Sequence, residues 1–209
     1  MKRVALLAGG KGSRLNFADK PLLEVCGKKI IEMVSSRLKL PILVVCSKEK
    51  AELYGEIVEE LHLTGVKIVC DIVADFGPSA GIYTALIECG DVVVVAGDMP
   101  FVKREVVDFL WDMGKQLECD ALIPEWNNGK KEPLLAYYSR RSIPAFKKAI
   151  ELEERKIMQA VERMLKPCYV SMNEIRKIDY ELISFFNINT LDDLRRAEQL
   201  CSSTDLVEG

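Results

Sequence analysis

Short apolar runs of strand length alternate with amphipathic helical patterns through the first half of the chain. No other feature of the sequence restricts the possible folds as strongly as this alternation. The expected strands are residues 4–7, 41–46, 66–70 and 91–96, and the helical patterns cover residues 30–39, 48–63, 80–88 and 103–117. The run Asp91–Ala96 is continuously apolar after its first residue, which is typical of a strand covered on both faces. This order predicts a parallel sheet between two layers of helices.

The second half is less regular. Strands are expected at residues 121–124 and 133–138 around a turn-forming stretch, helices near 143–150 and 155–165, and a short strand at 169–172. A last helix is expected to begin after Thr190, where Thr190 and Asp193 have the spacing of a capping box. Neither an internal repeat nor a linker divides the sequence, so we expect one domain over residues 1–209.

Composition excludes several classes of function. The 209 residues carry a net charge of −3 with both signs mixed along the chain, which argues against a nucleic-acid-binding protein. No apolar run reaches the ~20 residues of a membrane span, and no signal-peptide pattern is present, so we expect a cytoplasmic protein. The seven cysteines include no C-x-x-C pair, and Cys46 and Cys70 end apolar runs, as small hydrophobic residues do. Because His62 is the only histidine, a Cys/His zinc site and a His-activated nucleophile are both disfavoured.

A glycine-rich loop follows the first expected strand. Gly9, Gly10 and Gly12 allow a tight turn and a close backbone approach to a ligand, and Lys11 and Arg14 add positive charge. The loop matches neither a P-loop nor a dinucleotide fingerprint, which would need a third glycine where Leu15 stands. Open backbone N–H groups beside cations predict a different kind of phosphate-binding loop. An ordinary glycine turn with solvated cations is the alternative.

Aspartates follow two of the expected strands. Asp98 comes directly after the valine-rich run, and Asp71 ends the strand before it. Since ligands of such sheets bind beyond the carboxyl ends of the strands, we expect both to converge with the glycine loop on one edge. A carboxylate there suits Mg²⁺, so Asp98 is the candidate metal ligand. Asp71 could bind a ribose hydroxyl, assist the metal or form a turn.

Other polar residues are candidates for binding a ligand. Pro21 predicts an extended backbone at Lys20, whose ammonium could reach back to the loop. Asn187 and Asn189 alternate in an expected extended segment, so both amides should point the same way. The glycines around Ser79 would let a flat ligand approach, and Ser79 could cap the helix that follows.

These residues together resemble the nucleotidyltransferases that begin with an L-A-G-G-x-x-x-R loop, and especially the molybdenum cofactor guanylyltransferases. The matching segments are Leu7–Gly10 with Arg14, Asp19-Lys20, Gly77–Gly81, Gly97–Pro100, Glu132–Ala136 and Phe186–Thr190. The resemblance implies a three-layer α/β/α sandwich with a mostly parallel, Rossmann-like sheet of the nucleotide-diphospho-sugar transferase type. It also implies a nucleotide-binding half at about residues 1–117 and an acceptor-binding half at about residues 118–200.

The resemblance further implies Mg²⁺-dependent transfer of GMP from GTP to a molybdopterin-type acceptor, with release of pyrophosphate. The family's roles then fall on the backbone of Leu7, Ala8, Gly9 and Gly10 and on Asp71 for the nucleotide, on Arg14 and Lys20 for its phosphates, on Asp98 for Mg²⁺, and on Asn187 and Asn189 for the acceptor or metal. Arg14, Lys20 and Asp98 are the expected catalytic residues. Transient contacts with molybdoenzymes or other cofactor-biosynthesis proteins are expected, but none with nucleic acid or membrane.

Two departures leave alternatives open. Asn16-Phe17 stands where the family often has two glycines, and Cys46-Ser47 where an asparagine is common. The enzymatic alternative is a nucleotidyltransferase that uses CTP or another phosphorylated acceptor, such as adenosylcobinamide phosphate. The non-enzymatic alternative is a GTP-binding adaptor that delivers the cofactor.

Overall fold

Buried apolar segments form a main sheet of seven strands in the computed structural model, which describes residues 1–8, 19–164 and 166–202. The strands are β1 (Val4–Leu7), β4 (Ile42–Cys46), β5 (Val66–Cys70), β6 (Val92–Ala96), β7 (Ala121–Glu125), β8 (Leu135–Tyr138) and β9 (Pro167–Ser171). Two shorter strands, β2 (Glu24–Val25) and β3 (Lys28–Lys29), form a separate hairpin.

The main sheet has the strand order β5-β4-β1-β6-β8-β7-β9. The first four strands in this order are parallel, and β7 and β9 also pair in parallel. β8 runs antiparallel to both of its neighbours, β6 and β7. In register, Leu7 lies between Val45 and Ala96, so β1 and β6 end level with each other and β4 continues one residue further, to Cys46. The predicted mostly parallel sheet is confirmed, and its carboxyl edge is the place to look for a ligand.

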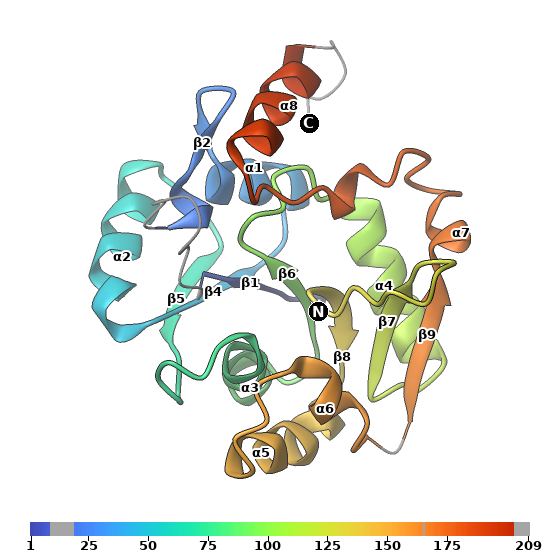
Figure 1. Ribbon diagram of the computed structural model, residues 1–209. Helices are drawn as coiled ribbons and strands as arrows, with labels where there is room; N and C mark the ends of the chain where they lie inside the picture. Colours follow the sequence, from blue (N-terminus) through green and yellow to red (C-terminus); the bar gives the residue numbers. More distant parts are fainter. Residues whose placement is uncertain (9–18, 165, 203–209) are drawn as a thin grey trace.

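Helices cover both faces of this sheet and complete three layers (Figure 1). They are α1 (Ile30–Leu38), α2 (Ala51–Glu60), α3 (Pro78–Cys89), α4 (Arg104–Gln116), α5 (Ile143–Glu151), α6 (Ile157–Val161), α7 (Met172–Ile175) and α8 (Leu191–Ser202), with 3-10 turns η1 (Lys20–Leu22), η2 (Lys48–Lys50), η3 (Arg140–Ser142) and η4 (Ile183–Phe185). One apolar core lies between the sheet and α1, α2 and α4, and a second between the sheet and α3, α5 and α6. Within the described residues, none of these helices has the length and apolar character needed to cross a bilayer.

Local structure departs from the sequence prediction in three helices. The predicted apolar stripe of α2 included Leu53, but Leu53 is 42% exposed and Tyr54 is fully buried beside Ile57. Ser79 does not cap α3, which begins at Pro78 after Gly77; its hydroxyl donates to the Arg155 carbonyl instead. α6 is shorter than the predicted helix over residues 155–165, since it ends at Val161. The predicted start of α8 is confirmed.

The start of α8 has the reciprocal hydrogen bonds of a capping box. The Thr190 hydroxyl accepts from the Asp193 N–H at 3.0 Å, and the Asp193 carboxylate accepts from the Thr190 N–H at 2.8 Å. Further along, α8 packs on the β2–β3 hairpin (Figure 1). A disulfide joins Cys26 in that hairpin to Cys201 near the end of α8. The C-terminal helix is therefore attached to a segment that lies near the start of the chain.

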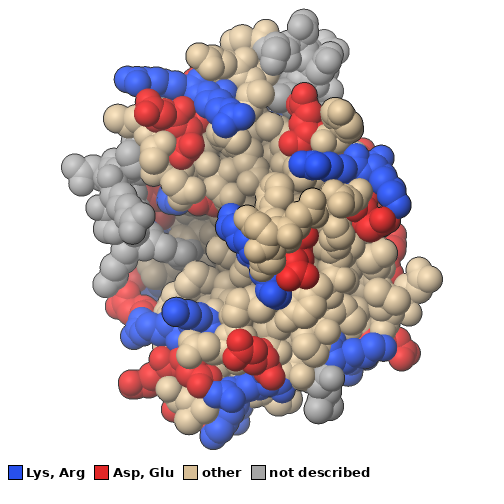
Figure 2. All heavy atoms as spheres, turned by 45° about the vertical axis from the view of Figure 1, so that its right-hand side comes forward, with Lys and Arg blue, Asp and Glu red and all other residues tan. Residues whose placement is uncertain are grey.

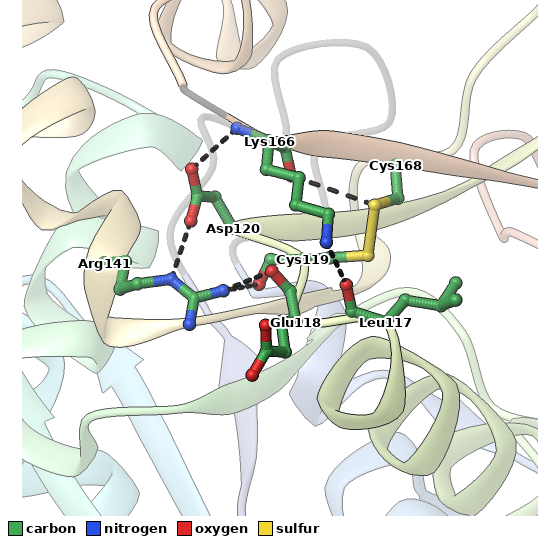
Figure 3. The surroundings of a disulfide bond; sticks show 7 residues. All are labelled: Leu117, Glu118, Cys119, Asp120, Arg141, Lys166 and Cys168. Carbon is green, nitrogen blue, oxygen red and sulfur yellow. Dashed lines mark hydrogen bonds and ion pairs between the residues drawn. A yellow bond between two sulfur atoms is a disulfide. The ribbon is translucent and has the colours of Figure 1, made fainter.

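A second disulfide, Cys119–Cys168, joins β9 to the residues that lead into β7 (Figure 3). Beside it, the buried Asp120 carboxylate accepts from the Arg141 guanidinium and from the Lys166 N–H, each at 2.9 Å. The Lys166 ammonium donates to the Leu117 carbonyl at 2.6 Å. These contacts lie at the amino ends of β7 and β9, so they secure the edge of the sheet far from its carboxyl ends.

Candidate functional site

Lys20, Asp98 and Asn189 meet at the carboxyl edge of the parallel strands. The Lys20 ammonium donates to Asp98 Oδ2 at 2.6 Å and to Asn189 Oδ1 at 2.7 Å. Lys20 belongs to η1, Asp98 follows β6, and Asn189 precedes α8, so 78 and 169 residues separate the bonded pairs in sequence. The fold therefore brings together a cation, an anion and an amide that the sequence analysis had singled out separately.

The backbone around Gly97 fixes this cluster. The Gly97 N–H donates to the Leu7 carbonyl at 3.1 Å, and the Ile188 N–H donates to the Asp98 carbonyl at 3.0 Å. A Cβ at Gly97 would lie 2.4 Å from Pro21 Cγ and 2.8 Å from the Leu7 carbonyl oxygen. Only glycine leaves room for Pro21 to pack here, directly after Lys20.

The carboxylates at this edge have unused hydrogen-bonding capacity. Four buried carboxylate oxygens lack a hydrogen bond within the described part of the chain, and they belong to Asp71, Asp98, Asp108 and Asp179. The oxygens of Asp108 and Asp179 nevertheless have a lysine ammonium within 3.0 Å. Asp71 Oδ1 and Asp98 Oδ1 have no such partner among the described residues. A buried, unpaired carboxylate oxygen is costly unless a ligand, ion or water satisfies it.

Asp71 lies further along the same edge. Its N–H donates to the Cys46 carbonyl at 2.8 Å, and a Cβ at Gly81 would lie 3.7 Å from its Oδ1. Burial raises the pKa of Asp71 to about 6, although a hydrogen bond from Thr84 acts in the opposite direction. Three strand spacings separate the ends of β5 and β6, or ~14 Å. This spacing favours separate contacts of Asp71 and Asp98 with an extended ligand over a shared ion.

Some predicted site residues have a different role or place. Gly9, Gly10 and Arg14 lie outside the described residues. The Leu7 carbonyl and the Ala8 N–H are both used within the sheet, the latter donating to the Val45 carbonyl at 2.8 Å. The backbone is extended at Asp19 rather than at Lys20, which begins a 3-10 turn. The prediction for Lys20 was wrong because the N–H groups in the first turn of a helix have no partner within the helix, so Pro21, which lacks an N–H, is tolerated there.

The two asparagines do not act as a pair. Asn189 contacts Lys20, whereas the Asn187 side chain donates to the Phe185 carbonyl at 2.9 Å. The prediction that both amides point the same way is therefore not met by their contacts. Only Asn189 joins the cluster.

The sequence analysis missed the residues that surround Asp19. Its carboxylate pairs with the Lys50 ammonium at 2.5 Å, and its Oδ1 lies 3.4 Å from the Tyr54 hydroxyl. Lys50 and Tyr54 are four residues apart around the start of α2, a spacing that places both on one helix face. That spacing is the signal that could have identified them.

The neighbouring Cys46 thiol is not a candidate nucleophile. Burial, and then the nearby Cys70 and Asp71, raise its pKa to about 12, so it stays protonated at neutral pH.

Donors for a metal are few. In residues 1–8, 19–164 and 166–202, no group of three or more His, Cys, Asp or Glu side chains could enclose a metal ion. Mg²⁺ does not need such a group, since it commonly binds one or two carboxylates and completes its shell with water and substrate phosphates. Asp98 Oδ1, which is buried and unpaired within the part of the chain that the structure describes, fits that pattern. On the face shown in Figure 2, positive and negative side chains are mixed and form no continuous basic area.

Comparison with known proteins gives consistent matches. A family described as MobA-like NTP transferase domain matches residues 4–168. A probable molybdenum cofactor guanylyltransferase of Methanosarcina mazei is 36% identical over 195 residues, which are 90% of this chain and 86% of that protein. One of Thermococcus kodakarensis is 37% identical over 94% of both chains. The crystal structure of molybdopterin-guanine dinucleotide biosynthesis protein A from Archaeoglobus fulgidus superposes with a TM-score of 0.84 at 40% identity, covering 96% of this chain and 98% of that chain.

Proposed function

The chain belongs to the MobA-like NTP transferase domain family, and from this premise we propose that it transfers GMP from GTP to a molybdopterin-type cofactor and releases pyrophosphate. The names of the relatives support the substrate pair. The observation that carries the chemistry is the Lys20–Asp98–Asn189 cluster at the carboxyl edge, in which one Asp98 oxygen has no hydrogen-bond partner among the described residues.

In the proposed reaction, a phosphate oxygen of the acceptor attacks the α-phosphorus of GTP in line with the leaving group. A new bond forms from that oxygen to the α-phosphorus, the bond from the α-phosphorus to the bridging oxygen breaks, and pyrophosphate leaves with the electron pair. The protein supplies positioning and positive charge, and no side chain forms a covalent intermediate.

The residues of the site divide the tasks of this reaction. Lys20 neutralises charge on the phosphates while Asp98 and Asn189 hold its ammonium in place. Asp98 Oδ1 would ligate Mg²⁺, which when bound polarises the phosphoryl oxygens and stabilises the leaving group. Asp71 would contact the nucleoside end, since it is ~14 Å along the edge. Arg14 and the backbone of Gly9 and Gly10 would bind phosphate oxygens. A cytoplasmic location and transient contacts with molybdoenzymes or other cofactor-biosynthesis proteins remain predictions.

The test is pyrophosphate release from GTP, CTP, ATP and UTP with Mg²⁺, each with and without molybdopterin. We expect release with GTP only, and only when the acceptor is present. Release with CTP, or with adenosylcobinamide phosphate in place of molybdopterin, would reassign the nucleotide or the acceptor. Tight GTP binding without release in any mixture would indicate an adaptor.

A further inference from the structure

We propose that Lys50, assisted by Tyr54, is a positioning residue: it holds Asp19 so that the adjacent Lys20 is directed toward Asp98 and Asn189. The inference rests on the proposed function only for the role of Lys20, which is to neutralise charge on the phosphates. The geometry that carries it lies entirely within the described residues.

Asp19 is an anchored carboxylate rather than a surface one. Its side chain is only 9% exposed, and the Lys50 ammonium lies 2.5 Å from its Oδ1. The Tyr54 hydroxyl, on a fully buried side chain, lies 3.4 Å from the same oxygen. Both partners come from the segment that follows β4, so the Asp19 anchor depends on the sheet and on α2.

The backbone transmits this anchor to Lys20. Asp19 is extended, with φ −152° and ψ 109°, and its carbonyl accepts from the Leu22 N–H at 3.1 Å, which closes the turn that contains Lys20. The Asp19 side chain contacts Lys50 of η2 and Tyr54 of α2, whereas the Lys20 side chain contacts the turn after β6 and the segment before α8. On the other side of Lys20, Pro21 packs on Gly97. Lys20 is thus held by its neighbour on each side.

The positive charge of Lys50 balances the negative charge of Asp19, so Lys50 does more than fill space. If Lys50 is replaced by an uncharged side chain, Asp19 becomes a nearly buried carboxylate without this ion pair, which is strongly unfavourable. The nearest cation along the chain is Lys20, so its ammonium is drawn away from Asp98. If Asp19 is neutralised at the same time, this pull disappears. The effect of losing Lys50 should therefore depend on the charge of Asp19.

The experiment compares Lys50→Met with the double variant Asp19→Asn/Lys50→Met. Lys48→Met is the matched control, since Lys48 is an exposed lysine in the same 3-10 turn. We expect Lys50→Met to lower kcat for pyrophosphate release about 10- to 100-fold, a loss typical of a shift of about 1 Å at a reacting group. The double variant should recover to within about threefold of the wild type, and Lys48→Met should match the wild type.

A merely structural Lys50 would lower the melting temperature while the folded protein kept its kcat. The inference is therefore overturned if the kcat of Lys50→Met is within twofold of the wild type, or if the double variant is as slow as the single one. Should Lys50→Met be too unstable to assay, Lys50→Gln replaces it, because its amide still donates to Asp19 without a charge.

A second readout separates this inference from the proposed function. Crystal structures of the wild type and of the Lys50 variant give the distance from Lys20 Nζ to Asp98 Oδ2 without any assay. A wild type that is inactive with every nucleotide and acceptor would refute the proposed function alone. The distance then decides the inference: lengthening in the variant supports it, and an unchanged contact overturns it.

Discussion

At the scale of single residues, the two oxygens of Asp98 are in different situations. Oδ2 accepts from Lys20, and Oδ1 is buried without a partner among the described residues. We predict that Asp98→Ala abolishes transfer, with a loss of at least 100-fold, because it removes both the proposed metal ligand and the partner that orients Lys20. The measurement is pyrophosphate release over a range of Mg²⁺ concentrations, beside a circular dichroism melt to check the fold. Full activity in Mg²⁺ would refute the role of Asp98.

The ionised Asp71 carboxylate, the form proposed to contact the nucleotide, should lower the stability of the folded protein. Burial raises its pKa from 3.8 to about 6, so the folded protein binds this proton more tightly than the unfolded chain does. The unfolding free energy therefore falls as pH rises between these two values and stays lower above about pH 6. Asp71→Asn has no charge to bury, so we predict that it is more stable than the wild type at pH 8.

The expected gain for Asp71→Asn at pH 8 is roughly 1 kcal/mol, less than the full pKa shift implies because water reaches part of the side chain. Urea unfolding at pH 4.5 and pH 8 measures it, and the difference between the two proteins should shrink at the lower pH. GTP binding by the variant should be weaker at both. A variant less stable than the wild type at pH 8 would contradict the burial argument.

At the scale of elements, the turn after β6 and helix α4 each contain a glycine that another element touches. A Cβ would lie 2.4 Å from Pro21 Cγ at Gly97 and 2.3 Å from the Tyr137 ring at Gly114. We predict that Gly97→Ala and Gly114→Ala each lower stability by about 1–3 kcal/mol, the usual cost of overpacking. Only Gly97→Ala should also reduce kcat, because the displaced Pro21 moves Lys20.

Thermal melts and pyrophosphate release on both alanine variants check this prediction, and Gly114→Ala serves as the control for lost stability alone. Equal kcat in the two variants would show that Pro21 does not set the position of Lys20.

The order and type of most elements could be predicted from the sequence because strand-length apolar runs and helical periodicity are local signals. The face that a helix buries was harder to predict. Leu53, Ile57 and Leu61 are four residues apart, but a helix turns every 3.6 residues, and the buried stripe passes through Tyr54 instead. The start of α8 was predictable because Thr190 and Asp193 satisfy each other locally.

At the scale of the whole molecule, the site depends on contacts that no local pattern encodes. The converging strand ends predicted that Asp98 lies beside the glycine loop, whereas Lys20 and Asn189 were assigned to the phosphates and to the acceptor or metal through the family resemblance. The sequence could not predict the Lys20–Asn189 hydrogen bond across 169 residues, nor which four of the seven cysteines form disulfides. Both follow from the path of the chain after α4, where β8 reverses direction.

The two disulfides lead to different predictions. Each should stabilise the fold by about 2–4 kcal/mol, so replacing either pair with serine should lower the melting temperature by roughly 5–15 °C in a chain of this length. Cys26→Ser/Cys201→Ser should also slow transfer, since it loosens the helix that follows Asn189. Cys119→Ser/Cys168→Ser should not, because that bridge lies at the opposite ends of the strands. Melting under oxidising conditions and kcat for each variant are the measurements, and an equal kcat in the two variants would contradict this distinction.

The reversed strand β8 has a consequence for how the polypeptide could be divided. It pairs with β6 from the first half and with β7 from the second, so the main sheet continues across the boundary near residue 117. A fragment ending there would expose β6 as an edge strand, and its unpaired backbone N–H and C=O groups could pair with other chains and cause aggregation. Each half expressed alone should therefore be insoluble, and only co-expression should allow the two halves to assemble. A split reporter or an inserted fusion partner would need a division point other than residue 117.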